Sequence, residues 1–224
     1  GYTASTENTD SFTDRRGSSA TTVTNVEDRD FNNSYGAAYY PWVQINDPAA
    51  NARLWVPPST IALGVMAASA ARSELWFAPA GFNRGGLNNG SAGLNVVNVV
   101  EKLTADQRDD LYEVNVNPIA SFPAEGIVVF GQKTLQATPS ALDRINVRRL
   151  FLVLQKAIAT AAKFQLFEFN DEITRANFRN IVEPFLRGVQ AKRGITDFLV
   201  ICDETNNTPD VIDANEFKCD IFIK

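Results

Sequence analysis

The chain has 224 residues, of which 45% are hydrophobic, and a formal net charge of -5 at pH 7. This length and apolar content suffice for one or two domains with a buried core, while the negative charge argues against nucleic acid as the main partner. No apolar run approaches the roughly 18 residues that a membrane-spanning helix needs, and the N-terminus lacks a signal-peptide pattern, so no membrane partner is expected.

The absence of histidine narrows the chemistry that this chain could perform. It removes the commonest general base at neutral pH, histidine-containing metal sites, and the serine and cysteine triads. Paired carboxylates remain, such as Asp203 with Glu204 or Asp109 with Asp110. Adjacent carboxylates in polar settings are usually solvated surface groups. We therefore expect no catalytic residue, no cofactor and no metal.

Two loops and two cysteines are further candidates for ligand binding or covalent chemistry. Residues 81–86 resemble a phosphate-binding loop but lack its Gly-Lys-Ser/Thr ending, and residues 203–210 lack the glycine and glutamate of a calcium loop. Both are expected to be plain turns. Cys202 and Cys219 are too few for a disulfide framework and fit a reducing cytosol as small core residues. A meeting of the two across neighbouring strands stays open.

The N-terminal part begins with a polar segment and continues into a strand and a helix. Residues 1–35 contain few apolar side chains to offset the entropy of ordering, which predicts a loop or an extended arm. The chain starts at Gly1 without a methionine, and we expect an upstream segment to be missing. Aromatic and β-branched residues predict a strand over 37–45. An alanine-rich helix over 60–72 is expected to follow, with Ser59 as its N-cap.

The middle of the chain alternates strand and helix signals. A weakly alternating strand is predicted over 94–103. Thr104 and Gln107 have the spacing of a capping box, which predicts a short helix ending near residue 113. The strands 114–121 and 127–135 are separated by a turn-rich stretch, which is typical of a hairpin.

A long amphipathic helix is predicted up to about residue 163, from apolar residues that recur at helical spacing. Two starts compete for it, the pair Ser140 and Asp143, and Asn146. We favour Asn146, because residues 143–145 can form an extended lead-in.

A second amphipathic helix is predicted over 174–192, with a kink caused by Pro184 and an end at Gly194 in a left-handed conformation. Residues 195–202 are strongly apolar, which predicts a strand buried on both faces. Residues 217–224 alternate and predict the last strand. The apolar stripe of the helix consists of Phe178, Ile181, Val182, Phe185, Leu186 and Val189.

Short motifs follow one another in a fixed order along residues 36–224. They are Tyr39-Tyr40-Pro41-Trp42-Val43, Val56-Pro57-Pro58-Ser59, Ala78-Pro79-Ala80-Gly81, Val114-Asn115-Val116-Asn117-Pro118-Ile119, Ile127-Val128-Val129-Phe130-Gly131-Gln132-Lys133-Thr134-Leu135, Asp143-Arg144-Ile145-Asn146-Val147-Arg148-Arg149-Leu150-Phe151, Phe167-Glu168-Phe169-Asn170-Asp171, Arg193-Gly194-Ile195-Thr196-Asp197-Phe198 and Cys202-Asp203-Glu204-Thr205-Asn206-Asn207-Thr208-Pro209. In this order they resemble the C-terminal part of the sheath proteins of contractile phage tails. Residues 1–35 lie outside the resemblance.

The resemblance implies a mixed α/β (α+β) fold, with mixed sheets packed against amphipathic helices in two compact parts. Residues 36–115 would be the end of the central, subtilisin-like domain, and residues 116–224 the C-terminal sheath domain without its terminal arm. A subtilisin-like fold without histidine cannot carry the catalytic triad. Because arms in related lattices add a strand to a neighbour's sheet, we expect a chain ending at Lys224 to assemble poorly.

The function that the resemblance implies is structural and not enzymatic. Subunits would stack as six-membered rings around a tail tube, and contraction would drive the tube through the host envelope for genome ejection. The implied partners are neighbouring sheath subunits, the tail tube protein, the baseplate and the tail terminator, in a virion assembled in the host cytoplasm. Two alternatives stay open, the sheath of a phage-derived injection particle of the R-type pyocin kind, and a hydrolase.

Two groups of basic residues are candidate sites. In the helix 174–192 and just after it, a basic side is expected to face the tail tube, formed by Arg175, Arg179, Arg187, Lys192 and Arg193. Arg148 and Arg149 lie in the first turn of their helix, where positive charge opposes the helix dipole. We expect at least one of them to pair with a carboxylate in a structural clamp, with Glu168 and Asp171 as candidates.

Overall fold

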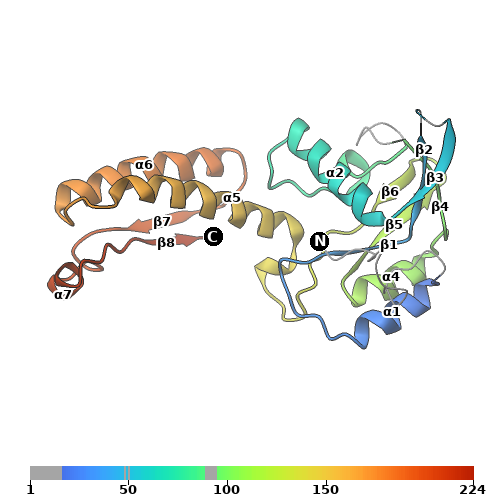
Figure 1. Cartoon of the computed structure of the whole chain (residues 1–224), viewed down its shortest axis with the longest axis horizontal. Helices are drawn as coiled ribbons and strands as arrows, with labels where there is room; N and C mark the ends of the chain where they lie inside the picture. Colours follow the sequence, from blue (N-terminus) through green and yellow to red (C-terminus); the bar gives the residue numbers. More distant parts are fainter. Residues whose placement is uncertain (1–16, 48, 50, 89–94) are drawn as a thin grey trace. The chain divides into compact units, whose positions relative to one another are not determined.

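A computed structural model of the chain describes residues 17–47, 49, 51–88 and 95–224, which form two compact units, Gly1–Arg149 and Leu150–Lys224 (Figure 1). Helices and strands occur in both units, which confirms the predicted mixed α/β class. Inside the first unit, β1 (Ala38–Tyr40) pairs with β5 (Val116–Phe122), and the sheath-domain boundary expected near residue 115 stays a prediction.

The first unit is built around a mixed sheet of strand order β1-β5-β6. β1 runs parallel to β5, with Ala38 opposite Val116, and the predicted hairpin joins β5 to the antiparallel β6 (Gly126–Val129). All three residues of β1 are buried, as are the first five of β5. The sheet is therefore covered on both of its faces.

Two clusters of buried side chains lie on the two faces of this sheet. Because side chains alternate along a strand, Tyr39 belongs to one cluster while its neighbours Ala38 and Tyr40 belong to the other. The first cluster includes side chains of α2 (Pro58–Arg72), and the second includes Leu111 of α4 (Ala105–Glu113). The result is a helix–sheet–helix arrangement.

A second sheet in the first unit has the strand order β3-β2-β4, formed by β3 (Ala52–Val56), β2 (Val43–Asp47) and β4 (Val96–Val99). The single strand predicted over 37–45 is therefore two strands in two sheets. Pro41 has no amide hydrogen to donate to a ladder and lies between them. The sequence did not predict β3, and β4 lies within the predicted strand 94–103.

The N-terminal segment contains a helix, α1 (Ser19–Glu27), so the prediction of an extended arm is wrong for its described part. Ser18 caps the helix by accepting a hydrogen bond from the Thr21 amide, and Val26 is buried in the second cluster. The amide and hydroxyl of Ser19 both donate to the Glu101 carboxylate. The core of the same unit thus supplies the apolar surface that the segment lacks by itself. Residues 1–16 lie outside the described part of the chain.

The helix starts of the first unit show where local signals are sufficient. The capping box of α4 is confirmed, because Thr104 and Gln107 each bind the other's backbone amide. α2 begins two residues before the predicted start, with Pro57 at the N-cap and Ser59 inside the first turn. Prolines suit these positions because the first helical amides have no intrahelical acceptor. The loop expected over 81–86 contains a single helical turn, α3 (Gly81–Arg84).

The helix α5 (Ile145–Ala162) follows a 3-10 turn, η1 (Ala141–Asp143), and crosses the division between the units. Ser140 caps the 3-10 turn and not the α-helix. Arg144 has an extended backbone, as expected for a lead-in, but the helix starts just after it, so Asn146 is not the N-cap. The helix is followed by η2 (Lys163–Gln165).

The second unit contains α6 (Glu172–Ala191), β7 (Phe198–Ile201), α7 (Pro209–Asp213) and β8 (Asp220–Ile223). α6 is capped by Asp171 and continues through Pro184, and its buried face carries Phe178, Val182, Leu186 and Val189 of the predicted stripe. Ile181 is exposed. None of the helices in the described ranges is long and apolar enough to cross a membrane.

The C-terminus of α6 differs from the prediction at one residue. The left-handed residue is Arg193, with φ 61°, and not Gly194. The amide of Gly194 donates to the Val189 carbonyl and that of Arg193 donates to the Gln190 carbonyl. These two bonds define a Schellman motif. An arginine therefore occupies the position that favours glycine.

The sheet of the second unit consists of β7 and β8 alone among the described residues. They are antiparallel, with Phe198 opposite Ile223 and Ile201 opposite Asp220, and α6 packs against β7. The prediction of a central strand buried on both faces is wrong, because Leu199 of β7 is 56% exposed. The alternation predicted for 217–224 is present in β8.

Candidate functional site

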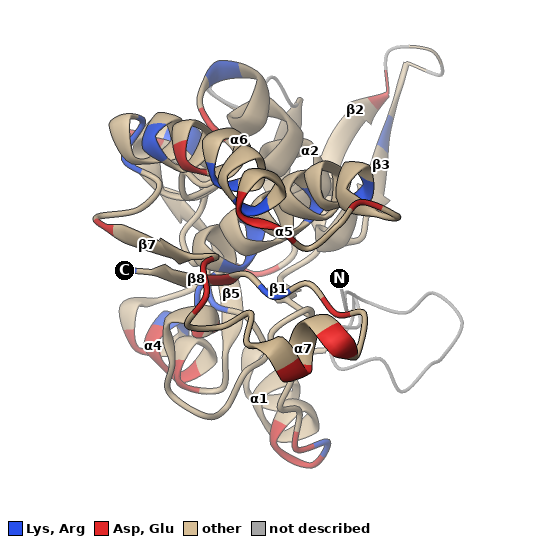
Figure 2. Ribbon diagram, turned by 90° about the vertical axis from the view of Figure 1, so that its left-hand side faces the viewer, with Lys and Arg blue, Asp and Glu red and all other residues tan. Residues whose placement is uncertain are grey.

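The basic residues of α6 do not form one continuous exposed side. Figure 2 shows basic and acidic segments interspersed along this helix and acidic residues on α7. Arg175 is only 5% exposed, whereas Arg187, Lys192 and Arg193 are exposed. The five candidates therefore separate into an internal pair near the start of the helix and an exposed group near its end.

Arg175 belongs to a buried polar network in the second unit. Its guanidinium donates to the backbone carbonyl of Asn170 at 3.1 Å and to the side-chain oxygen of the same residue at 2.9 Å. The Asn170 amide donates in turn to Asn207 Oδ1 at 3.0 Å and to the Glu216 carbonyl at 2.8 Å. The side chain of Arg175 is therefore used within the fold, and its tube-facing role stays a prediction without support from this geometry.

Asn207 is the centre of this network and was missed by sequence reasoning. It is 2% exposed, donates to the carbonyls of Asp203 and Lys218, and accepts from the Lys218 amide. It thus fixes the turn after β7 to the segment before β8. The only signal in the sequence is the motif Asn206-Asn207-Thr208-Pro209, which by itself predicts no more than a capped turn.

Arg179 also has an internal partner. Its guanidinium donates to the carbonyl of Cys202 at the end of β7. Burial raises the pKa of the Cys202 thiol, while Arg179 and Arg175 oppose this rise. Arg179 therefore joins α6 to the sheet, and a charge reversal there would disturb the fold as well as any surface contact.

The remaining candidates form the exposed basic end of α6, which consists of Arg187, Lys192 and Arg193. Arg187 pairs with Glu183 one turn earlier, at 3.1 Å, on an exposed face. Exposed pairs of this kind are weak and screened by salt. The group can therefore exchange its partners readily, and a tube-facing role stays a prediction for these three residues.

At the start of α5, where a structural clamp was predicted, Arg148 and Arg149 both bind neutral partners. Arg148 donates to the Ser34 hydroxyl and lies over the Tyr35 ring, with 4.2 Å between Cζ and the ring centroid. Arg149 donates to the Met66 carbonyl at 3.2 Å, and burial lowers its pKa. Both arginines thus fasten α5 to the first unit.

A carboxylate partner for these arginines stays a prediction. Asp171 accepts from the Thr174 amide as the cap of α6, and Glu168 is exposed. Among the described residues, Arg148 Nε and Arg149 Nη1 are buried without a hydrogen-bond partner. Each guanidinium therefore retains a donor that a carboxylate could satisfy.

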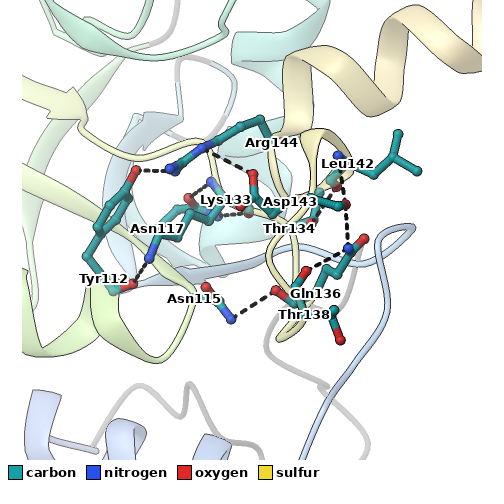
Figure 3. Close-up of polar contacts among 11 residues, drawn as sticks. Tyr112, Asn115, Asn117, Lys133, Thr134, Gln136, Thr138, Leu142, Asp143 and Arg144 are labelled. Atoms are coloured by element: carbon teal, nitrogen blue, oxygen red, sulfur yellow. Dashed lines mark hydrogen bonds and ion pairs between the residues drawn. The ribbon is translucent and has the colours of Figure 1, made fainter.

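A second network, drawn in Figure 3, holds the segment that leads into α5. Asn117 of β5 is fully buried and donates to the carbonyls of Ala38 and Lys133 at 3.0 and 2.8 Å, while it accepts from the Lys133 amide at 2.6 Å. The Lys133 ammonium donates to the Tyr112 carbonyl, and Arg144 donates to the Tyr112 hydroxyl. In the sequence, Asn117 stands out only as part of a motif. Its place in a strand gives no indication that its side chain is buried and holds the segment that leads into α5.

Apolar side chains are exposed at two places in the second unit. The aromatic turn, residues 164–169, exposes Phe164, Leu166, Phe167 and Phe169, and Phe167 has a left-handed backbone with φ 70°. On the sheet, Leu199 and Phe222 face each other across the strands and are 56% and 58% exposed. Exposed apolar patches commonly mark surfaces that bind other proteins.

The acidic residues after β7 form a turn. Bonds from the Thr205 hydroxyl and amide lower the pKa of Asp203, and bonds from Thr174 lower that of Asp171. Both carboxylates are thus engaged in local capping. Within the described ranges, no group of three or more acidic or cysteine residues could hold a metal ion.

Comparison with known proteins gives the same family as the sequence motifs. Residues 137–224 match the family described as phage tail sheath C-terminal domain. The chain is 45% identical over 170 residues to the tail sheath protein of Vibrio phage KVP40, and 41% identical over 170 residues to that of Enterobacteria phage T4. These alignments cover 76% of this chain, which spans about a quarter of each relative, 24% and 25% respectively.

The fold is similar to that of a solved sheath. The sheath complex of an extracellular contractile injection system in the contracted state matches with a TM-score of 0.76 and 22% identity, over 89% of this chain and 56% of that one. These matches confirm the resemblance to contractile tail sheath proteins.

Proposed function

We propose, from the premise that residues 137–224 are a phage tail sheath C-terminal domain, that the chain is part of the sheath subunit of a contractile phage tail. Copies of the subunit would stack as six-membered rings around a tail tube. Contraction would then slide the subunits into a shorter and wider lattice of lower free energy, which drives the tube through the host envelope. The role is structural and needs no turnover and no cofactor.

The observation that carries this proposal is the unfinished sheet of the second unit. A two-stranded sheet is marginally stable by itself, and β7–β8 exposes Leu199 and Phe222 on one face. A strand from a neighbouring subunit would extend the sheet through main-chain hydrogen bonds and cover apolar side chains. This surface fits a subunit whose stable state is a lattice.

A test of the proposed function uses an antibody against residues 137–224. Immunogold electron microscopy of contractile particles from the same source is expected to show label along the whole tail sheath. Label on particles that lack a capsid would favour a phage-derived injection particle of the R-type pyocin kind. Label absent from every sheath would refute both structural roles, and would leave the hydrolase to be tested by activity assays.

The contact with the tail tube is proposed for the exposed basic end of α6. An electrostatic contact of this kind is released by salt and can re-form after sliding, as a contracting lattice requires. Arg179 is left unchanged in the test because its guanidinium bonds to Cys202. We propose the double substitution of Arg187→Glu with Lys192→Glu.

The double variant is expected to lose co-sedimentation with purified tail tubes at low salt, while its far-UV circular dichroism is unchanged. A matched control reverses two exposed lysines elsewhere, Lys156→Glu with Lys163→Glu, for the same change in net charge. The control is expected to bind tubes normally. Equal binding by both variants would show that this end of α6 does not contact the tube. Baseplate and tail terminator contacts are proposed only from the resemblance.

A further inference from the structure

The two cysteines of the chain lie opposite each other at the end of the β7–β8 ladder. The last pair of the ladder is Ile201 with Asp220, so residues 202 and 219 fall at the next position in the same register. Asp197 and Lys224 exchange both of their backbone hydrogen bonds. Because hydrogen-bonded and non-hydrogen-bonded pairs alternate along an antiparallel ladder, Cys202 and Cys219 fall at a non-hydrogen-bonded position.

This position brings side chains close enough for a covalent bond. Non-hydrogen-bonded pairs have Cα atoms about 4.5 Å apart, which lies within the roughly 4.4–6.8 Å found in disulfides. The two thiols influence each other's pKa values, as close neighbours do, and both cysteines are free. The sequence left a meeting of the two open without favouring it, and the structure shows that they meet.

The pair is reachable from solvent through Cys219. Cys202 is fully buried, whereas Cys219 is partly exposed and lines a groove of about 810 Å³ beside Phe169, Phe178 and Phe217. A small oxidant in this groove would meet Cys219 first. Cys202 would then be the second thiol, already in contact with the first.

We propose that Cys202 and Cys219 are a disulfide-forming site that closes when the chain passes from a reducing to an oxidising medium, with a small-molecule disulfide as the oxidant. The thiolate of Cys219 attacks one sulfur of the oxidant and expels a thiolate, which takes up the proton that Cys219 released. The thiolate of Cys202 then attacks Cys219 Sγ and expels the second small thiol. The two cysteines lose two electrons and two protons, and the oxidant becomes two thiols.

The disulfide would close a loop around the turn after β7 and all of α7. It would also fix the segment before β8 to the residue whose carbonyl accepts from Arg179. Particle subunits are made in a reducing cytoplasm and work outside the cell, a premise that rests on the proposed function. The site would thus stay open during assembly and close in the released particle.

The reactivity of the site carries a pH signature. Burial raises the pKa of Cys219 to about 12, and the neighbouring Cys202 adds to this rise. The thiolate is the attacking species, so closure is slow at neutral pH and accelerates as the pH rises from about 7 to about 9. Loss of free thiol, followed by alkylation, measures this rate.

The test exposes the purified chain to oxidised glutathione and measures its mass, its free thiols and its melting temperature. We expect the monomer to lose the mass of two hydrogen atoms, both thiols to resist alkylation, and the melting temperature of the second unit to rise by several degrees, reversibly with dithiothreitol. The chain has no other cysteine, so this mass change identifies the bond. Thiols that stay alkylatable, or that stop at a glutathione adduct, would overturn the proposal.

The Cys219→Ser variant is the control, and it is expected to show neither the mass loss nor the shift. These measurements use isolated subunits and do not depend on assembly. Failure of the antibody to label any sheath, with closure intact, would reject the proposed function and leave the disulfide site standing. If the disulfide does not form while the antibody labels the sheath, the disulfide proposal is rejected and the proposed function stands.

Discussion

Replacing Asn117 with alanine tests the network that holds the segment leading into α5. The change removes three hydrogen bonds at a fully buried position and leaves the Lys133 amide without its acceptor. An orphaned buried donor costs about 1–3 kcal/mol, and the lost donors to the carbonyls of Ala38 and Lys133 add to this. We therefore expect the Asn117→Ala variant to lose about 2–4 kcal/mol of unfolding free energy in the first unit, a large part of the roughly 5–15 kcal/mol that is typical of domains.

The assay can follow the first unit alone. The three tryptophans, Trp42, Trp55 and Trp76, all lie in that unit. Urea unfolding monitored by tryptophan fluorescence therefore reports the first unit, while far-UV circular dichroism reports both. Asn98→Ala, at an exposed position of β4, is the control and is expected to change the midpoint little. A loss below about 1 kcal/mol for Asn117→Ala would refute the reasoning, because it would mean that water satisfies the Lys133 amide.

Three further predictions follow from single features. Arg193→Gly relieves a left-handed residue and is expected to stabilise the second unit by about 0.5–1 kcal/mol in thermal unfolding, and a lower melting temperature would contradict this. Thr104→Ala removes the cap of α4 and is expected to cost about 1 kcal/mol by tryptophan fluorescence, and an unchanged midpoint would count against the capping box. Burial raises the pKa of Cys219 to about 12, so the folded state favours the protonated thiol. The contribution of this preference to the free energy of unfolding is complete below the unfolded pKa of about 8.5 and is lost as the pH rises above that value. Burial likewise raises the pKa values of Tyr39 and Tyr40, whose contribution is lost only above about pH 10, so urea titrations at rising pH should weaken the second unit first.

The features that the sequence predicted well depend on neighbours within one turn of chain. The capping box of Thr104 and Gln107 and the apolar stripe of α6 follow from the spacing of nearby residues, and both are present in the structure. The hairpin of β5 and β6 was equally local. The motifs predicted the resemblance to tail sheath proteins, because a fixed order of several short segments is specific in a way that composition is not.

The features that the sequence missed depend on residues far apart along the chain. Arg175 resembles Arg187 in the sequence, but Arg175 is buried and donates to Asn170, which in turn donates to the distant Asn207. The burial of α1 likewise depends on Glu101, which lies 82 residues after Ser19. No periodicity records such pairings. Local spacing therefore placed the five basic candidates on one helix, but it could not separate the two with internal partners from the three that are exposed, and the tube-facing role stays a prediction.

The aromatic turn has a consequence for the cell that makes the protein. A free copy presents Phe164, Leu166, Phe167 and Phe169 to water, and such copies adhere to one another as their concentration rises. If those side chains are covered only after incorporation into a larger assembly, the copies that are not yet incorporated are the ones that can aggregate. The rate of synthesis would then have to match the rate of assembly, and arrested assembly would first be seen as precipitated protein.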